Sequence, residues 1–255
     1  MLATLTVTLV VCAPGFPGST AEAQPAMDAL ARALAASARL PPTSVAAAYE
    51  ETAPGCLRRL AEKDAALLLA TLPFYLEHEQ ELGLVPRLMA APKDGEPLER
   101  WTLVTGKDHP PSLAGYTVQS TAGYSPRFVR AAVPGLPADV EIVASSAVLS
   151  ALRRAANGEK LAVLLDGTQS AALGKLPFAA SLAVVETSPP LPVAVIATVD
   201  KRIDERQWKT LQAALTALSG EPSAREALDG VQMSAFVPLD AKALAAAQAA
   251  YRRAR

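Results

Sequence analysis

The 255-residue chain is poor in the residues that usually carry catalysis or hold metals. It contains two cysteines and two histidines, and aromatic residues make up 5% of it. Cys12 and Cys56 are too few for a disulfide scaffold and lack the spacing of a zinc site, which leaves one disulfide or two buried thiols open. His78 and His109 fit no nucleophile or metal motif. We therefore expect no catalytic residue, no metal and no cofactor, and so no enzyme.

An excess of charge of either sign is also missing. Lys and Arg number 24 against 25 Asp and Glu, and no basic cluster with interleaved aromatics occurs. This excludes a typical nucleic-acid-binding surface. No run reaches the roughly 18 apolar residues needed to span a bilayer, so we expect a soluble chain. Hydrophobic residues make up 51% of the chain, which is ample for a packed core in one large domain or two smaller ones.

The N-terminal segment LATLTVTLVV, followed by AEA before Gln24, resembles the apolar part and cleavage site of a signal peptide. No positive charge precedes it, however. Polar and apolar residues alternate at the period of a strand, with Thr4, Thr6 and Thr8 set against Leu5, Val7 and Leu9. We interpret the segment as the first strand of the fold, with no signal peptide in the chain as given.

The first half of the chain alternates strands with helices. After the first strand, the turn CAPGFPGST leads into a helical pattern that Ser19 or Thr20 would cap, with Glu22 in its first turn. The elements expected next are a strand from Val45, a helix over 54–64, a strand over 65–70 and a helix over 73–83. Such alternation predicts a parallel sheet with helices on both faces and right-handed crossovers.

The second half repeats this design. LRRLAEKDAALLLATL from Leu57 returns as LRRAANGEKLAVLLDGT from Leu152, an offset of 95 residues. Around the second copy we expect, in order, a strand from Tyr116, a helix over 125–135, a strand from Val140, a helix over 147–158, a strand over 161–166 and a turn over 167–173. Coincidence in an Ala- and Leu-rich chain is the alternative, but the agreement in element order favours two α/β lobes of related design.

Two further segments connect these lobes. RWTLVTGKDHP from Arg100 is interpreted as a strand leaving the first lobe, and PLPVAVIATVD from Pro190 as a strand returning to it. After Asp200 the pattern is helical. We therefore expect a two-lobed α/β fold: 1–108 in lobe 1, 109–189 in lobe 2, and 190–255 as a return strand and C-terminal helices that complete lobe 1. Two crossing strands permit hinge closure about a cleft.

The strongest candidate for a binding site is the turn STAGYSP, Ser120 to Pro126. In open parallel sheets, ligands bind beyond the carboxyl ends of the strands, where the next helices begin. Gly123 permits close backbone approach, Ser125 would cap the helix, and free N–H groups at the helix start suit an anion. An ordinary helix cap is the alternative. The candidate ligand-binding residues in this turn are Ser120, Thr121, Gly123, Tyr124 and Ser125.

Other turns at the same edges of the two predicted sheets add further candidates. Ser19 and Thr20 begin the first helix, and Tyr75 follows the third strand, where core packing is the alternative to ligand contact. Asp166 and Thr168 follow the corresponding strand of the second copy, and Asp166 can simply cap a helix. Cys12 and Cys56 can be reactive, because helix N-termini lower a thiol pKa, but we expect a structural role; a disulfide fits if the first strand's end and the second helix's start are neighbours.

The chain resembles type 2 periplasmic substrate-binding proteins, most closely the phosphate/phosphonate-binding group that accompanies ABC transporters. The segments that carry the resemblance are GSTAEAQPAMDALARAL, RLAEKDAALLLATLPFYL, RWTLVTGKD, SLAGYTV and PLPVAVIATVDKRIDERQWKTLQAALTAL. It implies a periplasmic, monomeric protein that holds a small anionic ligand between two lobes and presents it to a membrane permease. The turn STAGYSP matches that group's Ser- and Thr-rich turn only in part. A sensory or protein-interaction module with a degenerate cleft is the alternative function.

Overall fold

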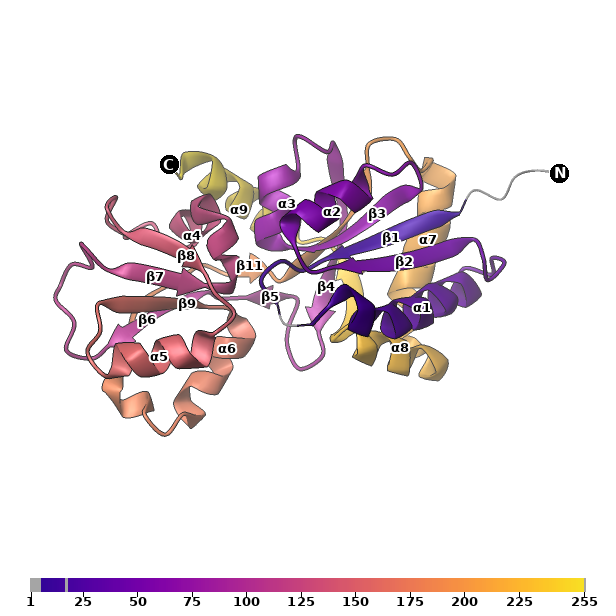
Figure 1. Ribbon diagram of the computed structural model, residues 1–255. Coiled ribbons are helices and arrows are strands. Elements are labelled where there is room, and N and C mark those ends of the chain that lie inside the picture. The colour runs from indigo at the N-terminus through magenta and orange to yellow at the C-terminus, as the bar shows by residue number, and fades with distance from the viewer. Residues whose placement is uncertain (1–5, 17, 255) are drawn as a thin grey trace. The chain divides into compact units, whose positions relative to one another are not determined.

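A computed structural model describes residues 6–16 and 18–254 of the chain (Figure 1). Contacts divide the chain into two compact units. Unit 1 comprises Met1–Pro97 and Pro192–Asp240, and unit 2 comprises Leu98–Leu191 and Ala241–Arg255. Thr4 and Leu5, which belong to the expected alternation of the first strand, lie outside the described residues.

Unit 1 is built on a six-stranded sheet with the order β13-β4-β12-β3-β1-β2. Its strands are β1 (Val7–Cys12), β2 (Val45–Glu50), β3 (Ala65–Thr71), β4 (Leu84–Pro92), β12 (Ala194–Val199) and β13 (Met233–Pro238). β1 runs parallel to β2 and β3, whereas β12 is antiparallel to both β3 and β4. Every residue of β1 and β12 is buried, Thr8 and Thr198 included, which explains why both strands are mostly apolar rather than half polar.

Helices cover both faces of this sheet (Figure 1). They are α1 (Thr20–Ser37), α2 (Ala53–Leu60), α3 (Leu72–His78), α7 (Glu205–Ala217) and α8 (Arg225–Gly230), with 3-10 turns at Leu218–Gly220 and Pro222–Ala224. Leu30 of α1, Trp208 of α7 and Leu228 of α8 share one core with Leu9 and Ile196 of the sheet. α2 and α3 lie on the opposite face.

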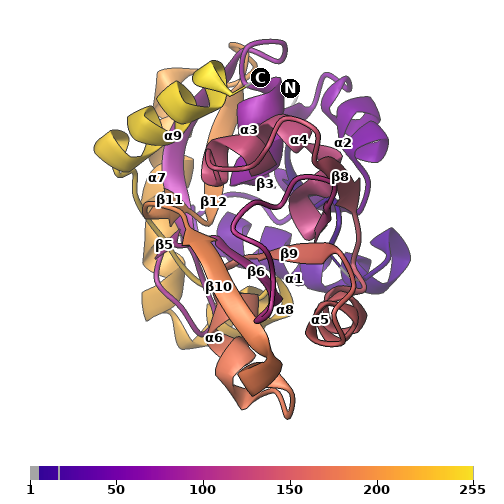
Figure 2. The same cartoon turned by 90° about the vertical axis from the view of Figure 1, so that its left-hand side faces the viewer.

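Unit 2 contains a five-stranded sheet with the order β10-β6-β9-β7-β8 (Figure 2). Its strands are β6 (Thr102–Gly106), β7 (Thr117–Ser120), β8 (Glu141–Ala144), β9 (Leu161–Leu165) and β10 (Leu182–Thr187). Its helices are α4 (Pro126–Ala132), α5 (Val148–Ala156), α6 (Gly167–Ala172) and α9 (Ala241–Arg253), with 3-10 turns at Thr121–Tyr124, Leu173–Lys175 and Ala179–Ser181. The short strands β5 (Leu98–Glu99) and β11 (Leu191–Pro192) pair with each other.

The two large sheets share one strand order, as the repeated sequence predicts. β2-β1-β3 in unit 1 and β8-β7-β9 in unit 2 are both parallel, and an antiparallel strand, β12 or β6, follows beside the third. The repeated phrase also encodes the same ion pair twice. Arg59 binds Asp64 at 2.9 Å, and the residues 95 positions later, Arg154 and Glu159, pair in the same way. In each copy the pair ties the end of a helix to the start of the strand that follows.

Four segments differ from the sequence-based expectation. Met233–Pro238 forms strand β13, although we expected only helices after Asp200. Leu84–Pro92 and Leu182–Thr187 form strands that were not predicted, and Gly167–Ala172 is a short helix rather than a turn. β13 and β10 are edge strands with few buried side chains, so their sequences lack a clear buried face.

The division into units also differs from the expected boundaries of 1–108, 109–189 and 190–255. Residues 98–108 belong to unit 2, because β6 pairs with β9 and β10. The C-terminal residues 241–255 belong to unit 2 rather than completing lobe 1, because α9 packs on α4. The chain therefore passes between the units three times, at residues 97–98, 191–192 and 240–241.

Candidate functional site

The candidate residues of unit 2 lie at one edge of its sheet. β7 and β9 are parallel, so their carboxyl ends, Ser120 and Leu165, share this edge. β6 runs the other way and begins here, with Thr102 paired to Leu165. The turn after β7, Asp166 after β9 and Glu99 before β6 therefore come together where ligands bind in open parallel sheets.

The turn after β7 contains one hydroxyl that is hydrogen-bonded within the fold and two that have no partner among the described residues. Ser120 Oγ donates to Leu164 O at 3.0 Å and accepts the Ala122 N–H at 3.2 Å. Thr121 Oγ1 and Ser125 Oγ are fully buried, and neither finds a hydrogen-bond partner among the described residues. Buried polar groups without a partner are rare in native proteins. The hydrogen-bonding capacity of these two side-chain hydroxyls is therefore left unused by the described residues.

Ser125 occupies the N-cap position of α4, as expected, but its hydroxyl does not cap the helix. Its backbone has φ −117° and ψ 79°, away from the extended geometry in which a serine side chain reaches the next amides. The alternative of an ordinary side-chain cap is therefore wrong for this residue. Tyr124, which precedes it, is partly exposed at the end of the 3-10 turn.

Gly123 is needed for packing against the neighbouring strand. A Cβ at this position would lie 2.4 Å from Val143 O and 2.5 Å from Ala144 N, both in β8. Gly123 does permit a close approach of backbone, and the backbone that comes close is that of β8. The turn can pack this closely against β8 only with glycine at position 123.

Two carboxyl groups lie on the same edge, beside the first turn of α6. Asp166 Oδ1 accepts the Gln169 N–H at 2.8 Å in a capping box, so Asp166 caps its helix. Glu99 Oε2 accepts the Gly167 N–H at 2.7 Å. Burial raises the pKa of Asp166, and it raises the pKa of Glu99 to about 7, with the charge of Asp166 acting in the same direction. Thr168 is exposed.

Glu99 was not among the residues predicted from the sequence. It belongs to a two-residue strand, and nothing in its local sequence distinguishes it from an exposed acid such as Glu96. Only the pairing of distant segments brings it to the first amide of α6.

The raised pKa of Glu99 predicts how stability changes with pH. With a pKa of about 7, Glu99 keeps its proton in the folded protein up to about pH 7, whereas the unfolded chain releases it near the ordinary pKa of 4.5. Folding therefore becomes less favourable as pH rises through this window, by about 2–3 kcal/mol. Urea unfolding of unit 2 measured at pH 5 and pH 8 should show this loss, and Glu99→Gln should abolish most of it. An equal loss in Glu99→Gln would contradict the assignment.

In unit 1, one of the two residues expected to hold an anion, Ser19, is already engaged. Ser19 donates to Glu22 Oε2 through its backbone N–H at 3.0 Å and through its hydroxyl at 2.8 Å, and its hydroxyl accepts the Glu22 N–H. These bonds lower the pKa of Glu22, which keeps a negative charge at the start of α1. Thr20 is the first residue of that helix. Tyr75 is buried to 1% exposure in α3, within the packed side of the sheet.

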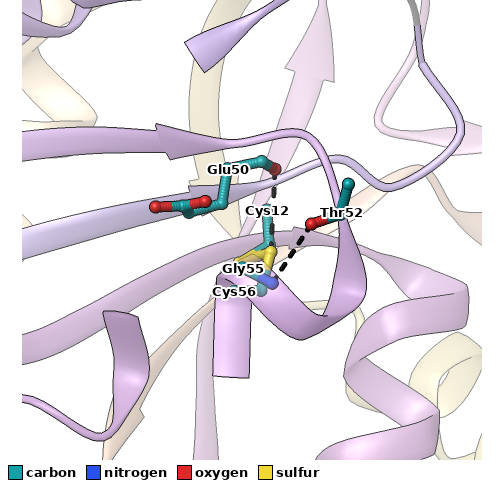
Figure 3. Close-up of a disulfide and its surroundings, with 5 residues drawn as sticks. All are labelled: Cys12, Glu50, Thr52, Gly55 and Cys56. Carbon is teal, nitrogen blue, oxygen red and sulfur yellow. Dashed lines mark hydrogen bonds between the residues drawn. A yellow bond between two sulfur atoms is a disulfide. The ribbon is translucent and has the colours of Figure 1, made fainter. Parts of the chain in front are cut away.

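A disulfide joins Cys12, at the end of β1, to Cys56 in α2 (Figure 3). Their Cα atoms lie 5.8 Å apart and both residues are buried. The start of α2 is folded tightly against them, since Gly55 N–H donates to Thr52 Oγ1 at 3.1 Å and the space beside Gly55 is taken by the Glu50 carboxylate. This confirms one disulfide over two buried thiols. The bond fixes the first turn of α2 at the edge where β1 ends.

Two classes of feature are missing from the part of the chain that the structure describes. Within residues 6–16 and 18–254, no helix is long and apolar enough to cross a membrane. The same residues hold no cluster of three or more His, Cys, Asp or Glu side chains arranged to bind a metal ion.

Comparison with known proteins relates the chain by structure and not by sequence. No family model and no curated protein matches it. A Xanthomonas citri protein solved with bound chloride has a TM-score of 0.76 and 18% identity, with 98% of each chain covered, and the same protein solved with ATP has a TM-score of 0.74.

Two further solved structures share the fold. The binding component of an ABC phosphonate transporter from Pseudomonas aeruginosa has a TM-score of 0.64 and 15% identity, covering 94% of this chain and 83% of that one. PhnD1 of Prochlorococcus marinus, in complex with methylphosphonate, has a TM-score of 0.62 and 11% identity over 98% of both chains. The chain thus has the α/β fold of the periplasmic solute-binding proteins.

Proposed function

We propose that the protein is an extracytoplasmic solute-binding protein that captures a small ligand and delivers it to an ABC transporter. The observation that carries this proposal is the pair of buried hydroxyls, Thr121 Oγ1 and Ser125 Oγ, which have no partner among the described residues. They lie in the turn that follows a parallel strand, at the sheet edge where such folds hold ligands. A bound solute would satisfy both groups.

The ligand class that fits these groups is a small oxyanion of the phosphate or phosphonate type. Hydroxyl groups can donate hydrogen bonds to such an anion without bringing a fixed charge. Solved structures of the same fold contain chloride, ATP and methylphosphonate. Because Ser19 is engaged with Glu22, the turn of unit 2 would supply most of the contacts.

The disulfide supports an extracytoplasmic location. Disulfides form and persist in oxidising compartments such as the bacterial periplasm and are rare in the cytosol. The Cys12–Cys56 bond is buried and joins the end of β1 to the start of α2, so it would stabilise the edge of the unit 1 sheet at which a ligand would bind. A membrane permease is the partner that this function requires, and the proposed working form is a monomer.

A sensory or protein-interaction module is the rival function, and one observation favours it. Acidic side chains accept hydrogen bonds from backbone amides at the start of two helices. In unit 1 the Ser19 N–H donates to Glu22, and in unit 2 the Gly167 N–H donates to Glu99. These amides would otherwise be available to an anion. If the turn with Thr121 and Ser125 binds no solute either, the protein would act by binding a partner protein through the surface of its units.

A thermal-shift panel distinguishes these functions. Phosphate, methylphosphonate, sulfate, sulfonates, amino acids and dicarboxylates are added to the full chain at concentrations from micromolar to millimolar. A ligand at about 100 times its Kd stabilises the folded state by about 2.7 kcal/mol, enough to raise Tm by several degrees. Stabilisation by oxyanions alone supports the proposal; stabilisation by another class corrects the ligand; no stabilisation favours the interaction module.

A further inference from the structure

Unit 2 contains a cavity that is separate from the turn at Thr121 and Ser125. It has a volume of about 360 Å³ and lies between the end of α4, the loop that follows it, and the end of α9. Val133, Pro134 and Leu136 line it from the loop, and Ala250 and Ala254 line it from the C-terminal segment. Its size is in the range of small-molecule sites, and most of its described lining residues are apolar.

Two of the described lining residues are charged, and both are arginines. Arg130 is held in place, since it donates to the carbonyl oxygens of Pro137, Ala138 and Val140 at 3.1–3.2 Å. Arg253 is exposed and makes no hydrogen bond or ion pair with any other residue that the structure describes. The cavity therefore has one fixed cation in its wall and one free cation beside it.

No acidic side chain of the described residues pairs with Arg130 or Arg253. Among the residues that the structure describes, no acidic side chain lines the cavity. Asp139, next to the lining residue Ala138, accepts the Gly115 N–H at 3.2 Å. Arg127 adds a third positive charge close by, stacked 4.7 Å from the Tyr251 ring centre and donating to Arg252 O and Ala254 O.

Part of this charge has a structural explanation. Cations stabilise helix C-termini. Arg127 donates to a carbonyl oxygen at the end of α9, and Arg130 donates to a carbonyl oxygen of the loop that follows α4. Arg253 is different, because its guanidinium binds no carbonyl among the described residues although it borders the cavity. The guanidinium of Arg253 is thus left without a partner among the described residues, beside the apolar residues of the cavity.

We propose that this cavity is a second binding site, for a small monocarboxylate with an apolar body such as an aromatic or short-chain acid. The carboxylate would bind the guanidinium of Arg253, which matches its two oxygens with paired donors. The apolar body would lie against Val133, Leu136 and Ala250. This site does not depend on the proposed function, because it shares no residue with the turn at Ser120–Ser125.

The test is a titration of the full chain, labelled with ¹⁵N, with benzoate and hexanoate, followed by amide chemical shifts. Saturable shifts are expected at Ala250, Arg253 and Ala254, with a Kd on the order of 1 mM for ligands this small. Benzyl alcohol and benzylamine, which keep the apolar body without the carboxylate, should bind at least about tenfold more weakly. Absence of saturable shifts at these amides for both acids overturns the proposal.

Two variants and one matched control locate the site. Arg253→Gln should weaken benzoate binding about tenfold, which corresponds to about 1.4 kcal/mol. Ala250→Leu, which fills the cavity from α9, should also weaken it. Arg252→Gln changes the net charge equally on the same helix but does not line the cavity, so it should leave binding unchanged. Equal weakening by Arg252→Gln and Arg253→Gln would mean that general charge attraction, and not the site, holds the acid.

Discussion

Removing the Cys12–Cys56 disulfide is expected to lower the free energy of unfolding of unit 1 by about 4 kcal/mol. The two cysteines are separated by 44 positions, and closing a loop of that length removes conformational freedom from the unfolded chain. A loss of this size lowers Tm by about 8–16 °C in a protein of this length. The double variant Cys12→Ala with Cys56→Ala, followed by urea unfolding, measures it.

Reduction provides the control for this prediction. Dithiothreitol should destabilise the natural chain by a similar amount and leave the double alanine variant unaffected. Because both cysteines are buried, reduction is expected to be slow in the folded protein and to accelerate in urea. A natural chain whose unfolding midpoint is the same with and without reductant would contradict a stabilising disulfide.

Gly123→Ala is expected to destabilise unit 2 by about 3 kcal/mol, because the added methyl group overlaps the backbone of a neighbouring strand. The nearest atoms are Val143 O and Ala144 N, at 2.4 and 2.5 Å from the position of the new Cβ. Neither is the movable end of a side chain. Larger residues such as tryptophan should prevent unit 2 from folding, so they cannot serve as tests of ligand binding.

Gly174→Ala is the matched control for this change. Gly174 is also in unit 2, and a Cβ there meets nothing within 4 Å. Its replacement should change the free energy of unfolding by less than about 1 kcal/mol, in either direction. Similar urea midpoints for the two variants would show that the contact between the turn and β8 is not tight.

The sequence predicted the elements that carry a strong local pattern. The two helices that contain LRR and the buried strands after them were predicted from their sequences alone. The ion pairs of Arg59 and Arg154 explain part of the sequence repeat. Strand β13 was missed because only Phe236 among its residues is fully buried, at 2% exposure, so no alternation identifies it. Tertiary pairing with β4, and not local preference, makes this segment a strand.

The candidate site was predictable only in part. The residues of the turn after β7 could be named, since Ser, Thr, Gly and Pro at a strand end mark a strand-to-helix turn. Whether Ser125 caps its helix depends on a backbone angle, and whether Gly123 faces solvent depends on β8, which is distant in sequence. Glu99 reaches the site through long-range pairing alone.

The most direct test of the central claim compares Ser125→Ala with the natural chain in two measurements. Without ligand, the variant should be as stable as the natural chain or more stable, because it removes a buried hydroxyl that has no partner, at a saving of up to about 1 kcal/mol. In calorimetric titrations with methylphosphonate and inorganic phosphate, its affinity should fall about tenfold. A variant that is less stable without ligand, or that binds both oxyanions as tightly as the natural chain, would show that the Ser125 hydroxyl serves the fold and not a solute.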